Sequence, residues 1–171
     1  MLNRFRYRKM MDNILLPKEM DLLLVIPPPF FMKMPHIGVA YLSAFLKQNG
    51  LRPATYDLSI KLYNQASPEL KKFWNIDCIN SFFVSEIAEK IFTNFEEEID
   101  EFIDDILATE TRVIGFSVNI TSIYLASRMA KIIKARDPRR LIIFGGPGTY
   151  FKHPRELIQP ASADIYVIGE G

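Results

Sequence analysis

Two apolar segments of the chain end in residues whose side chains are small or carry a hydroxyl group. Residues 113–117 read Val-Ile-Gly-Phe-Ser, and residues 141–147 read Leu-Ile-Ile-Phe-Gly-Gly-Pro, as buried parallel strands do where a sheet opens towards a ligand. Glycine lets a flat or bulky ligand approach the backbone, and a hydroxyl group can donate a hydrogen bond to it. The glycines are Gly145, Gly146 and Gly148, and the hydroxyl groups belong to Ser117 and Thr121. The pattern predicts a binding site, with a simple tight turn as the alternative explanation of the glycine pair.

The sequence lacks the patterns that bind phosphate or carry out catalysis. It contains no Gly-x-Gly-x-x-Gly and no glycine-rich loop followed by Lys-Ser or Lys-Thr, which disfavours dinucleotide and nucleoside triphosphate sites. No nucleophile has an adjacent base, and no carboxylate pair is framed by a glycine turn. A flavin or nucleotide site ranks lowest, because the hydroxyl groups near the expected site are only those of Ser117, Thr121, Ser122 and Thr149. We therefore expect this chain to bind a ligand without catalysing a reaction by itself.

Composition restricts the class of protein. The 171 residues are 49% hydrophobic and 24% charged, which suits one globular domain with a sizeable core. A net charge of +1 disfavours nucleic acid as a partner. The single cysteine, Cys78, excludes a disulfide framework or an all-cysteine cluster site within this chain and fits a cytoplasmic location. No apolar run is long enough to enter a membrane as a spanning helix, and residues 1–20, which lack the features of a signal peptide, are expected to form an N-terminal arm.

The periodicity of the apolar residues predicts strands that alternate with helices. The expected strands are residues 21–26, 54–58, 113–117, 141–144 and 164–168. The expected helices are residues 38–49, 122–136 and 154–159, with Gly50 as a left-handed cap of the first. This alternation predicts an α/β fold, a doubly wound, Rossmann-like (flavodoxin-like) parallel sheet of five strands in the order 2-1-3-4-5. Because ligands bind beyond the carboxyl ends of such strands, we expect the site among residues 27–38, 117–122, 145–150 and 169–171.

Residues 59–110 are longer than a simple crossover and are expected to form a helical insertion after the second strand. Within residues 84–106, apolar side chains recur at helical intervals, which predicts one long helix or two. The acidic side chains of residues 96–105 take the remaining faces, and we expect them to be solvated rather than to bind a metal. The aromatic residues of the insertion are expected in the core, with a substrate- or partner-binding surface as the alternative. They are Trp74, Phe82, Phe83, Phe92, Phe95 and Phe102.

Several motifs follow one another in the order found in one known family. They are Pro27-Pro28-Pro29, residues 38–46 (GVAYLSAFL) with Gly50, residues 113–117, Gly145-Gly146-Pro147 and residues 167–171 (VIGEG). On these motifs, residues 21–171 resemble the amino-terminal cobalamin-binding domain of cobalamin-dependent radical S-adenosylmethionine (SAM) enzymes. The resemblance implies a sheet that holds cobalamin over a following barrel, which uses S-adenosylmethionine and binds a [4Fe-4S] cluster through Cys-x-x-x-Cys-x-x-Cys. With only Cys78, this chain would be the cofactor-binding part of a larger enzyme, and the barrel would attach in cis at its carboxyl end.

The sequence around His36 departs from that of the wider cobalamin-binding relatives. Those relatives use Asp-x-His-x-x-Gly, with the histidine as lower cobalt ligand, whereas residues 34–38 here read Met-Pro-His-Ile-Gly. Cobalt ligation by His36 and a role as a loop residue or helix cap therefore both stay open. The relatives' Ser-x-Leu maps to residues 117–119, and their Gly-Gly maps to residues 145–146, which would make room for the nucleotide tail of the cofactor. The expected cofactor-binding residues, with no metal ligand assigned, are Pro28, Pro29, His36, Gly38, Ser117, Val118, Asn119, Thr121, Gly145, Gly146, Pro147, Gly148, Gly169 and Glu170.

The sequence thus predicts a cobalamin-binding fragment of a radical enzyme that transfers methyl groups or remodels carbon skeletons. Cobalt would supply the chemistry, and this chain would supply shape, burial and orientation. The chain ends on glycine directly after a strand, so we expect it to be a piece of a longer protein that can form a homodimer through the surface the barrel would cover. The alternative is a cofactor-free flavodoxin-like domain for interaction or regulation. A phosphoacceptor receiver domain is disfavoured, because Pro27 to Pro29 and Ser117 stand where it needs acidic residues.

Overall fold

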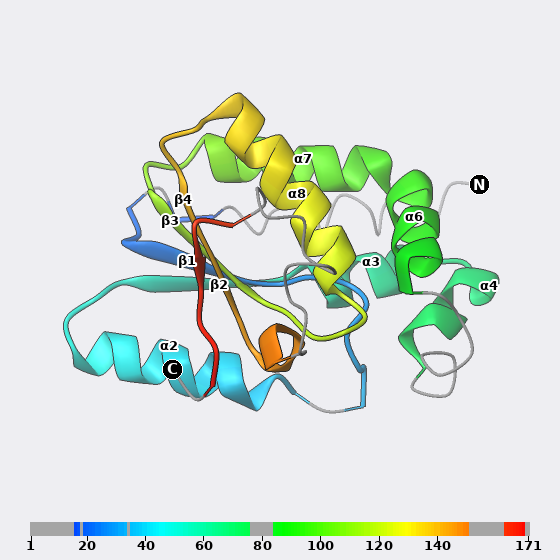
Figure 1. Cartoon of the computed structure of the whole chain (residues 1–171), viewed down its shortest axis with the longest axis horizontal. Coiled ribbons are helices and arrows are strands. Elements are labelled where there is room, and N and C mark those ends of the chain that lie inside the picture. The colour runs from blue at the N-terminus through cyan, green and yellow to red at the C-terminus, as the bar shows by residue number, and fades with distance from the viewer. Residues whose placement is uncertain (1–15, 18, 34, 76–83, 151–162, 170–171) are drawn as a thin grey trace, which may run out of the picture.

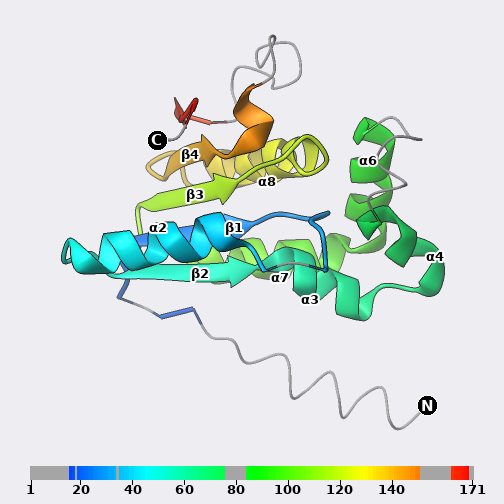
Figure 2. The ribbon, with the colours of Figure 1, turned by 90° about the horizontal axis from the view of Figure 1, so that it is seen from below.

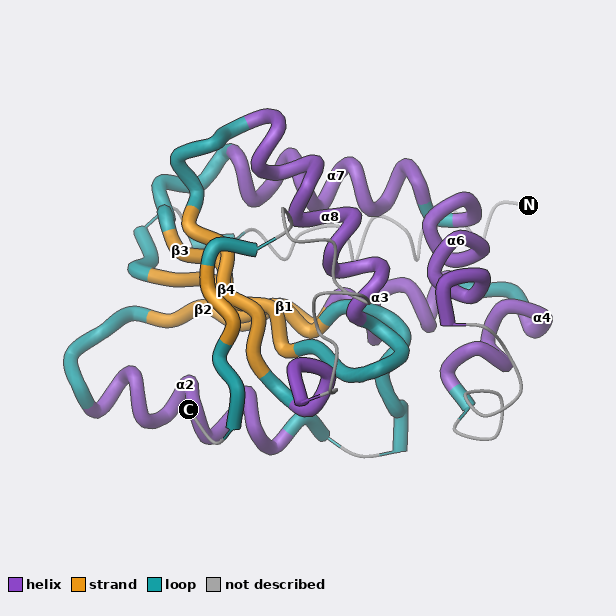
Figure 3. The backbone as a smooth tube through the Cα atoms, viewed as in Figure 1, coloured by secondary structure: helices purple, strands orange, loops and turns teal. Residues whose placement is uncertain are grey.

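A computed structural model describes residues 16–17, 19–33, 35–75, 84–150 and 163–169. Its centre is a sheet of five parallel strands in the order β2-β1-β3-β4-β5 (Figures 1 and 3). The predicted flavodoxin-like fold and its strand order are thereby confirmed. The strands are β1 (Leu22–Ile26), β2 (Pro53–Asp57), β3 (Val113–Ser117), β4 (Leu141–Gly145) and β5 (Ile165–Tyr166).

Helices cover both faces of the sheet. Figures 1 and 2 show α7 and α8 on one face and α2 on the other. This division follows from right-handed crossovers. The connection from β1 to β2 crosses the sheet in one direction, and the connections from β2 to β3 and from β3 to β4 cross it in the other, so their helices lie on opposite faces. The helices are α2 (Ile37–Gln48), α3 (Leu58–Gln65), α4 (Pro68–Lys71), α6 (Val84–Asn94), α7 (Glu96–Leu107) and α8 (Ile123–Arg136), with 3-10 turns η1 (Lys72–Trp74) and η2 (Pro147–Tyr150).

The main core lies between the sheet and helices α7 and α8. The strand register aligns Val25 with Tyr56 and Phe116, and it aligns Phe144 with Phe116 and Tyr166. The ring of Phe144 meets those of Phe116 and Tyr166 edge-on, at centroid distances of 5.6 and 5.8 Å. In α8, the apolar stripe that faces this core contains the buried Leu125, Met129 and Ile133, and Ile132 is half-buried against the same core.

The α2 face has a smaller core, and part of it stays open. Val39 packs on Leu24 and Ile26 of β1. Val39, Ser43 and Leu46 face the sheet, and Leu42, three residues after Val39, is 43% exposed. Gly50, with φ of +79°, has the left-handed conformation expected after the helix.

The insertion after β2 forms separate helices. The segment predicted as one helix or two is two, α6 and α7, which meet at Phe95, where the backbone leaves helical geometry. Phe92, Phe95 and Phe102 are buried with Trp74, as predicted for a core stripe, whereas Phe82 and Phe83 lie outside the described residues. The acidic side chains of residues 96–105 are exposed, apart from the half-buried Glu98, so the prediction of a solvated face is confirmed.

Element boundaries differ from the sequence predictions at two strands. The second strand ends at Asp57, because the Asp57 carboxylate accepts the Ile60 N–H and so caps α3, in which Leu58 is the first residue. The strand β5 is limited to Ile165 and Tyr166 and is shorter than residues 164–168, although the N–H groups of Asp164 and Val167 also donate to carbonyl oxygens of β4. The expected helix at residues 154–159 and most of the expected arm at residues 1–20 lie outside the described residues. Within the described part of the chain, no helix has the length and apolar character to cross a membrane.

Candidate functional site

The carboxyl ends of β1, β3 and β4 meet at the edge of the sheet where the sequence predicts the site. Ser117 at the end of β3 pairs in register with Gly145 at the end of β4. Both residues lie on the α2 face, because side chains alternate along a strand and Phe116 and Phe144 are buried on the other face. Gly115 is on the α2 face as well. We call Gly115, Ser117 and Gly145 the small-residue floor.

Space lies above one of these glycines. Among the described residues, a Cβ on Gly145 would contact only the Cβ of Val167, at 3.7 Å. A Cβ on Gly115 would meet the side chain of Leu24 at 3.2 Å. A group that rests on the floor can therefore approach the backbone at Gly145 more easily than at Gly115.

His36 lies beside the floor and begins α2. Its Nδ1 accepts the backbone N–H of Val39 at 3.4 Å, which makes His36 the N-cap of the helix. Its Nε2 is 3.0 Å from Oγ of Ser117, and its ring stacks on that of Phe30 with centroids 4.3 Å apart. The helix-cap role that the sequence left open is thus present, and His36 joins the loop after β1, the start of α2 and the end of β3.

The surroundings of His36 favour its neutral form. Burial lowers the pKa of His36, and the negative charge of Asp57 offsets part of this effect. Burial raises the pKa of Asp57, while the N–H groups of Ile60 and Ser59 and the charge of His36 act in the opposite direction. Burial thus favours the neutral form of both groups, and the opposite charge of each partner reduces this effect.

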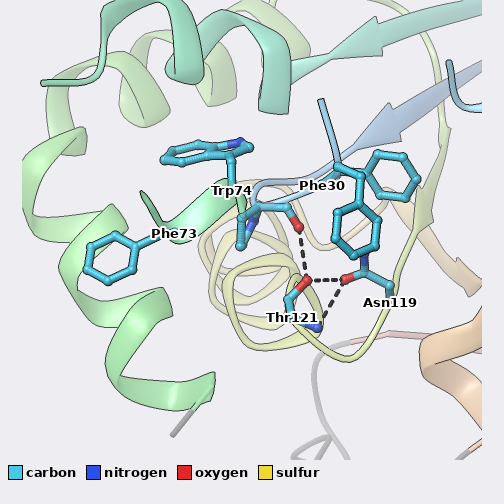
Figure 4. Close-up of a pocket in the computed structure, with 7 residues that line it drawn as sticks. Phe30, Phe73, Trp74, Asn119 and Thr121 are labelled. Carbon is cyan, nitrogen blue, oxygen red and sulfur yellow. Dashed lines mark hydrogen bonds between the residues drawn. The ribbon is translucent and has the colours of Figure 1, made fainter. Parts of the chain in front are cut away.

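Polar side chains hold the loop that follows β3 (Figure 4). Oδ1 of Asn119 accepts the N–H groups of Thr121 and Ser122 at 3.0 and 2.8 Å. Oγ1 of Thr121 lies 2.6 Å from that same oxygen and 3.0 Å from the carbonyl oxygen of Pro29. Thr121 and Ser122 are buried, so their hydroxyl groups hold the loop in place and do not face the open edge.

The loop after β4 packs directly against the loop after β3. Gly146 has a φ of +103°, and a Cβ there would lie 2.8 Å from the carbonyl oxygen of Val118. A Cβ on Gly148 would lie 2.8 Å from the backbone of Asn119. At these two glycines the absent side chain therefore makes room for backbone, which agrees with the tight-turn alternative at Gly146, whereas a side chain at Gly145 would find room. Oγ1 of Thr149 completes the turn at 2.8 Å from the carbonyl oxygen of Gly146.

A shallow depression, in which the described residues enclose no space for a water molecule, lies between the same loops and the insertion (Figure 4). Its lining residues are Pro29, Phe30, Phe31, Phe73, Trp74, Asn119 and Thr121. Ser59 connects the two sides, because its Oγ accepts both the Trp74 Nε1–H at 2.8 Å and the Phe30 N–H at 2.9 Å. The insertion thereby fixes the position of the loop after β1.

Most of the predicted site residues come together at this edge, from three loops. The loop after β1 and the start of α2 contain Pro28, Pro29, His36 and Gly38. The end of β3 and the loop after it contribute residues 117–121, and the end of β4 and the loop after it contribute residues 145–148. Gly169 follows β5 with a φ of +93°, and Glu170 lies outside the described residues.

Three residues of the site were missed from the sequence. The rule that ligands bind at strand ends, applied to β2, would have named Asp57. Phe30 lies within residues 27–38, where the site is expected, but the sequence does not single it out. Nothing in the sequence marks Ser59, because its role depends on contacts with Trp74 and Phe30. No group of three or more potential metal-ligating side chains gathers within the described ranges.

Comparison with known proteins agrees with this geometry. The B12 binding domain family matches residues 30–171, a range that includes the loops after β3 and β4 and the loop after β1 from Phe30 onwards. No curated protein and no solved structure matches the chain. Because the match covers more than half of the sequence, the chain belongs to the B12-binding domain family.

Proposed function

We propose that the chain binds cobalamin at the carboxyl edge of its sheet, with part of the cofactor resting on the small-residue floor beside α2. The observation that carries this proposal is the open backbone at Gly145, next to the half-buried Ser117, in a region that the B12 binding domain family covers. Open β-strand backbone flanked by a hydroxyl group suits a large, partly apolar ligand.

Exposed apolar side chains of α2 and of the segment after β5 support the same conclusion. Ile37 and Tyr41 of α2 are 71% and 75% exposed, and Ile168, after β5, is 65% exposed. Helix α2 has one charged side chain, that of Lys47, so its outer face is apolar for a surface helix. Exposed apolar surface of this kind marks a ligand- or partner-binding region.

The chain's own residues would bind and orient the cofactor. Ser117 can donate its hydroxyl proton, Gly145 allows close approach to β4, and His36 with Asn119 and Thr121 holds the flanking loops. Cobalamin, when bound, supplies a cobalt centre that can carry an alkyl group. Gly146 and Gly148 act indirectly, by letting the loops after β3 and β4 pack together.

The binding proposal is tested by an absorption titration of the purified chain with hydroxocobalamin. We expect saturable spectral changes, and we expect Gly145→Phe to abolish them, because the new ring would fill the space above the floor. The matched control is Ala108→Phe, which adds the same ring at an exposed position at the end of α7. A folded chain that does not bind, or a folded Gly145→Phe variant that binds like the parent, would overturn the proposal.

We further propose that the domain serves a radical SAM enzyme, of the methyl-transferring or carbon-skeleton-remodelling kind, with the barrel in cis. The motif resemblance between residues 21–171 and that family supports this. A [4Fe-4S] cluster and S-adenosylmethionine would be bound outside these 171 residues, because the sequence has one cysteine. The test is the gene sequence that follows Gly171: a Cys-x-x-x-Cys-x-x-Cys motif in the same reading frame supports the proposal, and a different downstream domain refutes it.

An interaction domain without a cofactor is the second candidate function. The exposed apolar side chains of α2, which include those of Tyr41 and Phe45, favour it. Light scattering with the double substitution Tyr41→Ser and Phe45→Ser is its test. A concentration-dependent homodimer that this variant loses, in a chain that does not bind hydroxocobalamin, would favour interaction over cofactor binding.

A further inference from the structure

His36 uses both of its ring nitrogens inside the protein. The Val39 N–H can only donate, so Nδ1 must accept and carries no proton. A neutral imidazole then has its proton on Nε2, from which it is donated to Oγ of Ser117 at 3.0 Å. The first turn of α2 thereby determines the tautomer of His36. The other hydrogen bond of this ring joins it to Ser117, 81 positions further along the sequence.

In this tautomer the nitrogen that faces the end of β3 carries a proton and cannot bind a metal. A ligating histidine presents one unprotonated nitrogen to the metal, and its other ring N–H usually donates to a carboxylate or carbonyl group. In His36 the nitrogen nearer to Ser117 is the protonated one, and Nδ1 faces the first turn of α2 as an acceptor. Asp57 acts on His36 through its charge, and no hydrogen bond joins the two side chains.

The ring is also fixed in orientation. It stacks on Phe30 at an interplanar angle of 24°, and the N–H of Phe30 is bound by the buried Ser59. Turning the imidazole towards a ligand at the edge would break the cap of α2, the bond to Ser117 and this stacking together. The loop after β1 would lose its connection to β3 at the same time.

We propose that His36 is a positioning residue, a latch that holds the loop after β1 and the start of α2 on Ser117, and that it does not coordinate the cobalt of a bound corrinoid. The second half of this statement rests on the proposed function, and the first half does not. In the loaded protein, Ser117 would keep its own hydroxyl proton for another acceptor, because His36 donates to it.

The latch is tested first without cofactor, by NMR. The variant His153→Asn leaves His36 as the sole histidine of the chain, and ¹⁵N labelling of histidine then reports on this ring alone. We expect the spectrum of a neutral imidazole protonated at Nε2, and we expect Ser117→Ala to perturb that Nε2–H signal. A ring protonated at Nδ1, or a signal that Ser117→Ala leaves unchanged, would overturn the latch.

Coordination is tested by electron paramagnetic resonance of the same labelled chain loaded with cob(II)alamin. A coordinated ¹⁵N-histidine would split the cobalt lines into doublets, whereas the unlabelled base of cobalamin itself could give only ¹⁴N triplets. We expect no doublets, and doublets that vanish in His36→Asn would overturn the proposal. Asn retains an N-cap but cannot reach Ser117, so this variant should weaken binding by about tenfold through the loosened loop without changing the spectrum of the bound corrinoid. If the folded chain does not bind cob(II)alamin, the proposed function fails, and the NMR experiment alone decides the latch.

Discussion

Gly146 faces the carbonyl oxygen of Val118 so closely that a Cβ at position 146 would lie 2.8 Å from it. The same residue has a φ of +103°, a conformation that side-chain-bearing residues rarely adopt. Backbone hydrogen bonds reinforce the contact, because Val118 N donates to Gly145 O at 2.8 Å and Gly148 N donates to Val118 O at 2.9 Å. Two loops of the edge therefore form one packed unit that depends on glycine.

We predict that Gly146→Ala destabilises the fold by about 2 kcal/mol or more, because backbone strain and a clash with backbone act together. Gly145→Ala is the matched control, and we expect it to change the free energy of unfolding by less than about 1 kcal/mol, since its Cβ finds space. Urea unfolding of the two variants measures the difference. Equal losses of stability would contradict the assigned roles of the two glycines.

Arg140 is a buried cation that serves the turns at the far end of the sheet. Its side chain is 8% exposed, and it donates to the carbonyl oxygens of Leu107 and Thr109, each at 3.0 Å, and to that of Thr111. Nε also pairs with Asp137 at 3.0 Å. Hydrogen bonds from Arg139 and then from Arg140 lower the pKa of Asp137. Arg140 thus satisfies carbonyl groups beyond the end of α7 that water cannot easily reach.

We predict that Arg140→Met lowers the free energy of unfolding by about 3 kcal/mol, because it leaves buried carbonyl groups without donors. Arg139→Met is the matched control, since Arg139 binds the same Asp137 but its side chain is 83% exposed. We expect that change to stay within about 0.5 kcal/mol. Thermal or urea unfolding separates the two, and a small effect of Arg140→Met would show that the carbonyl groups find other partners.

The sheet was predictable because β1, β3 and β4 are short, largely apolar segments separated by segments with helical periodicity. That alternation predicts a doubly wound sheet whose loops gather at the carboxyl edge of its strands, and the common flavodoxin-like arrangement supplies the order of the strands. It also places Ser117 and Gly145 at the edge, since each ends an apolar segment.

Contacts between distant segments were not predictable. Gly145 and Gly146 are identical residue types and neighbours, yet a Cβ would make an ordinary contact with Val167 at one and would clash with the Val118 backbone at the other. Their difference depends on a backbone dihedral angle and on the path of another loop, neither of which appears in sequence periodicity. Likewise, Ser59 looks like any helix serine until the fold brings Trp74 and Phe30 to it.

We predict that Ser59→Ala destabilises the protein by about 1–3 kcal/mol, because it leaves the Trp74 Nε1–H and the Phe30 N–H without their acceptor. Trp74 is the single tryptophan, so its fluorescence should shift as the indole loses this bond. Ser127→Ala is the matched control: Ser127 is also buried, but its Oγ has no hydrogen-bond partner among the described residues. We expect Ser127→Ala to be neutral or stabilising, and similar effects of both changes would refute the role of Ser59.

The latch at His36 predicts that stability declines as the solution becomes mildly acidic. Burial lowers the pKa of His36 below its ordinary value of 6.5, so the unfolded chain takes up this proton at a higher pH than the folded chain does. The contribution of His36 is therefore fully present above about pH 6.5 and is lost as the pH falls from there towards the folded-state pKa. Asp57, whose pKa is raised, acts in the opposite direction, but only as the pH falls towards its ordinary value of 3.8.

Urea unfolding between about pH 8 and pH 5.5 should therefore show a falling free energy of unfolding in the parent chain and a flatter profile in His36→Asn. Asn keeps the cap of α2 and does not titrate, so the variant removes the proton-binding group without removing the cap. His153 is present in both chains, and its contribution cancels in the difference between the two profiles. Parallel profiles would contradict this prediction, because they would mean that His36 has the same pKa in the folded and unfolded states despite its contacts with Val39 and Ser117.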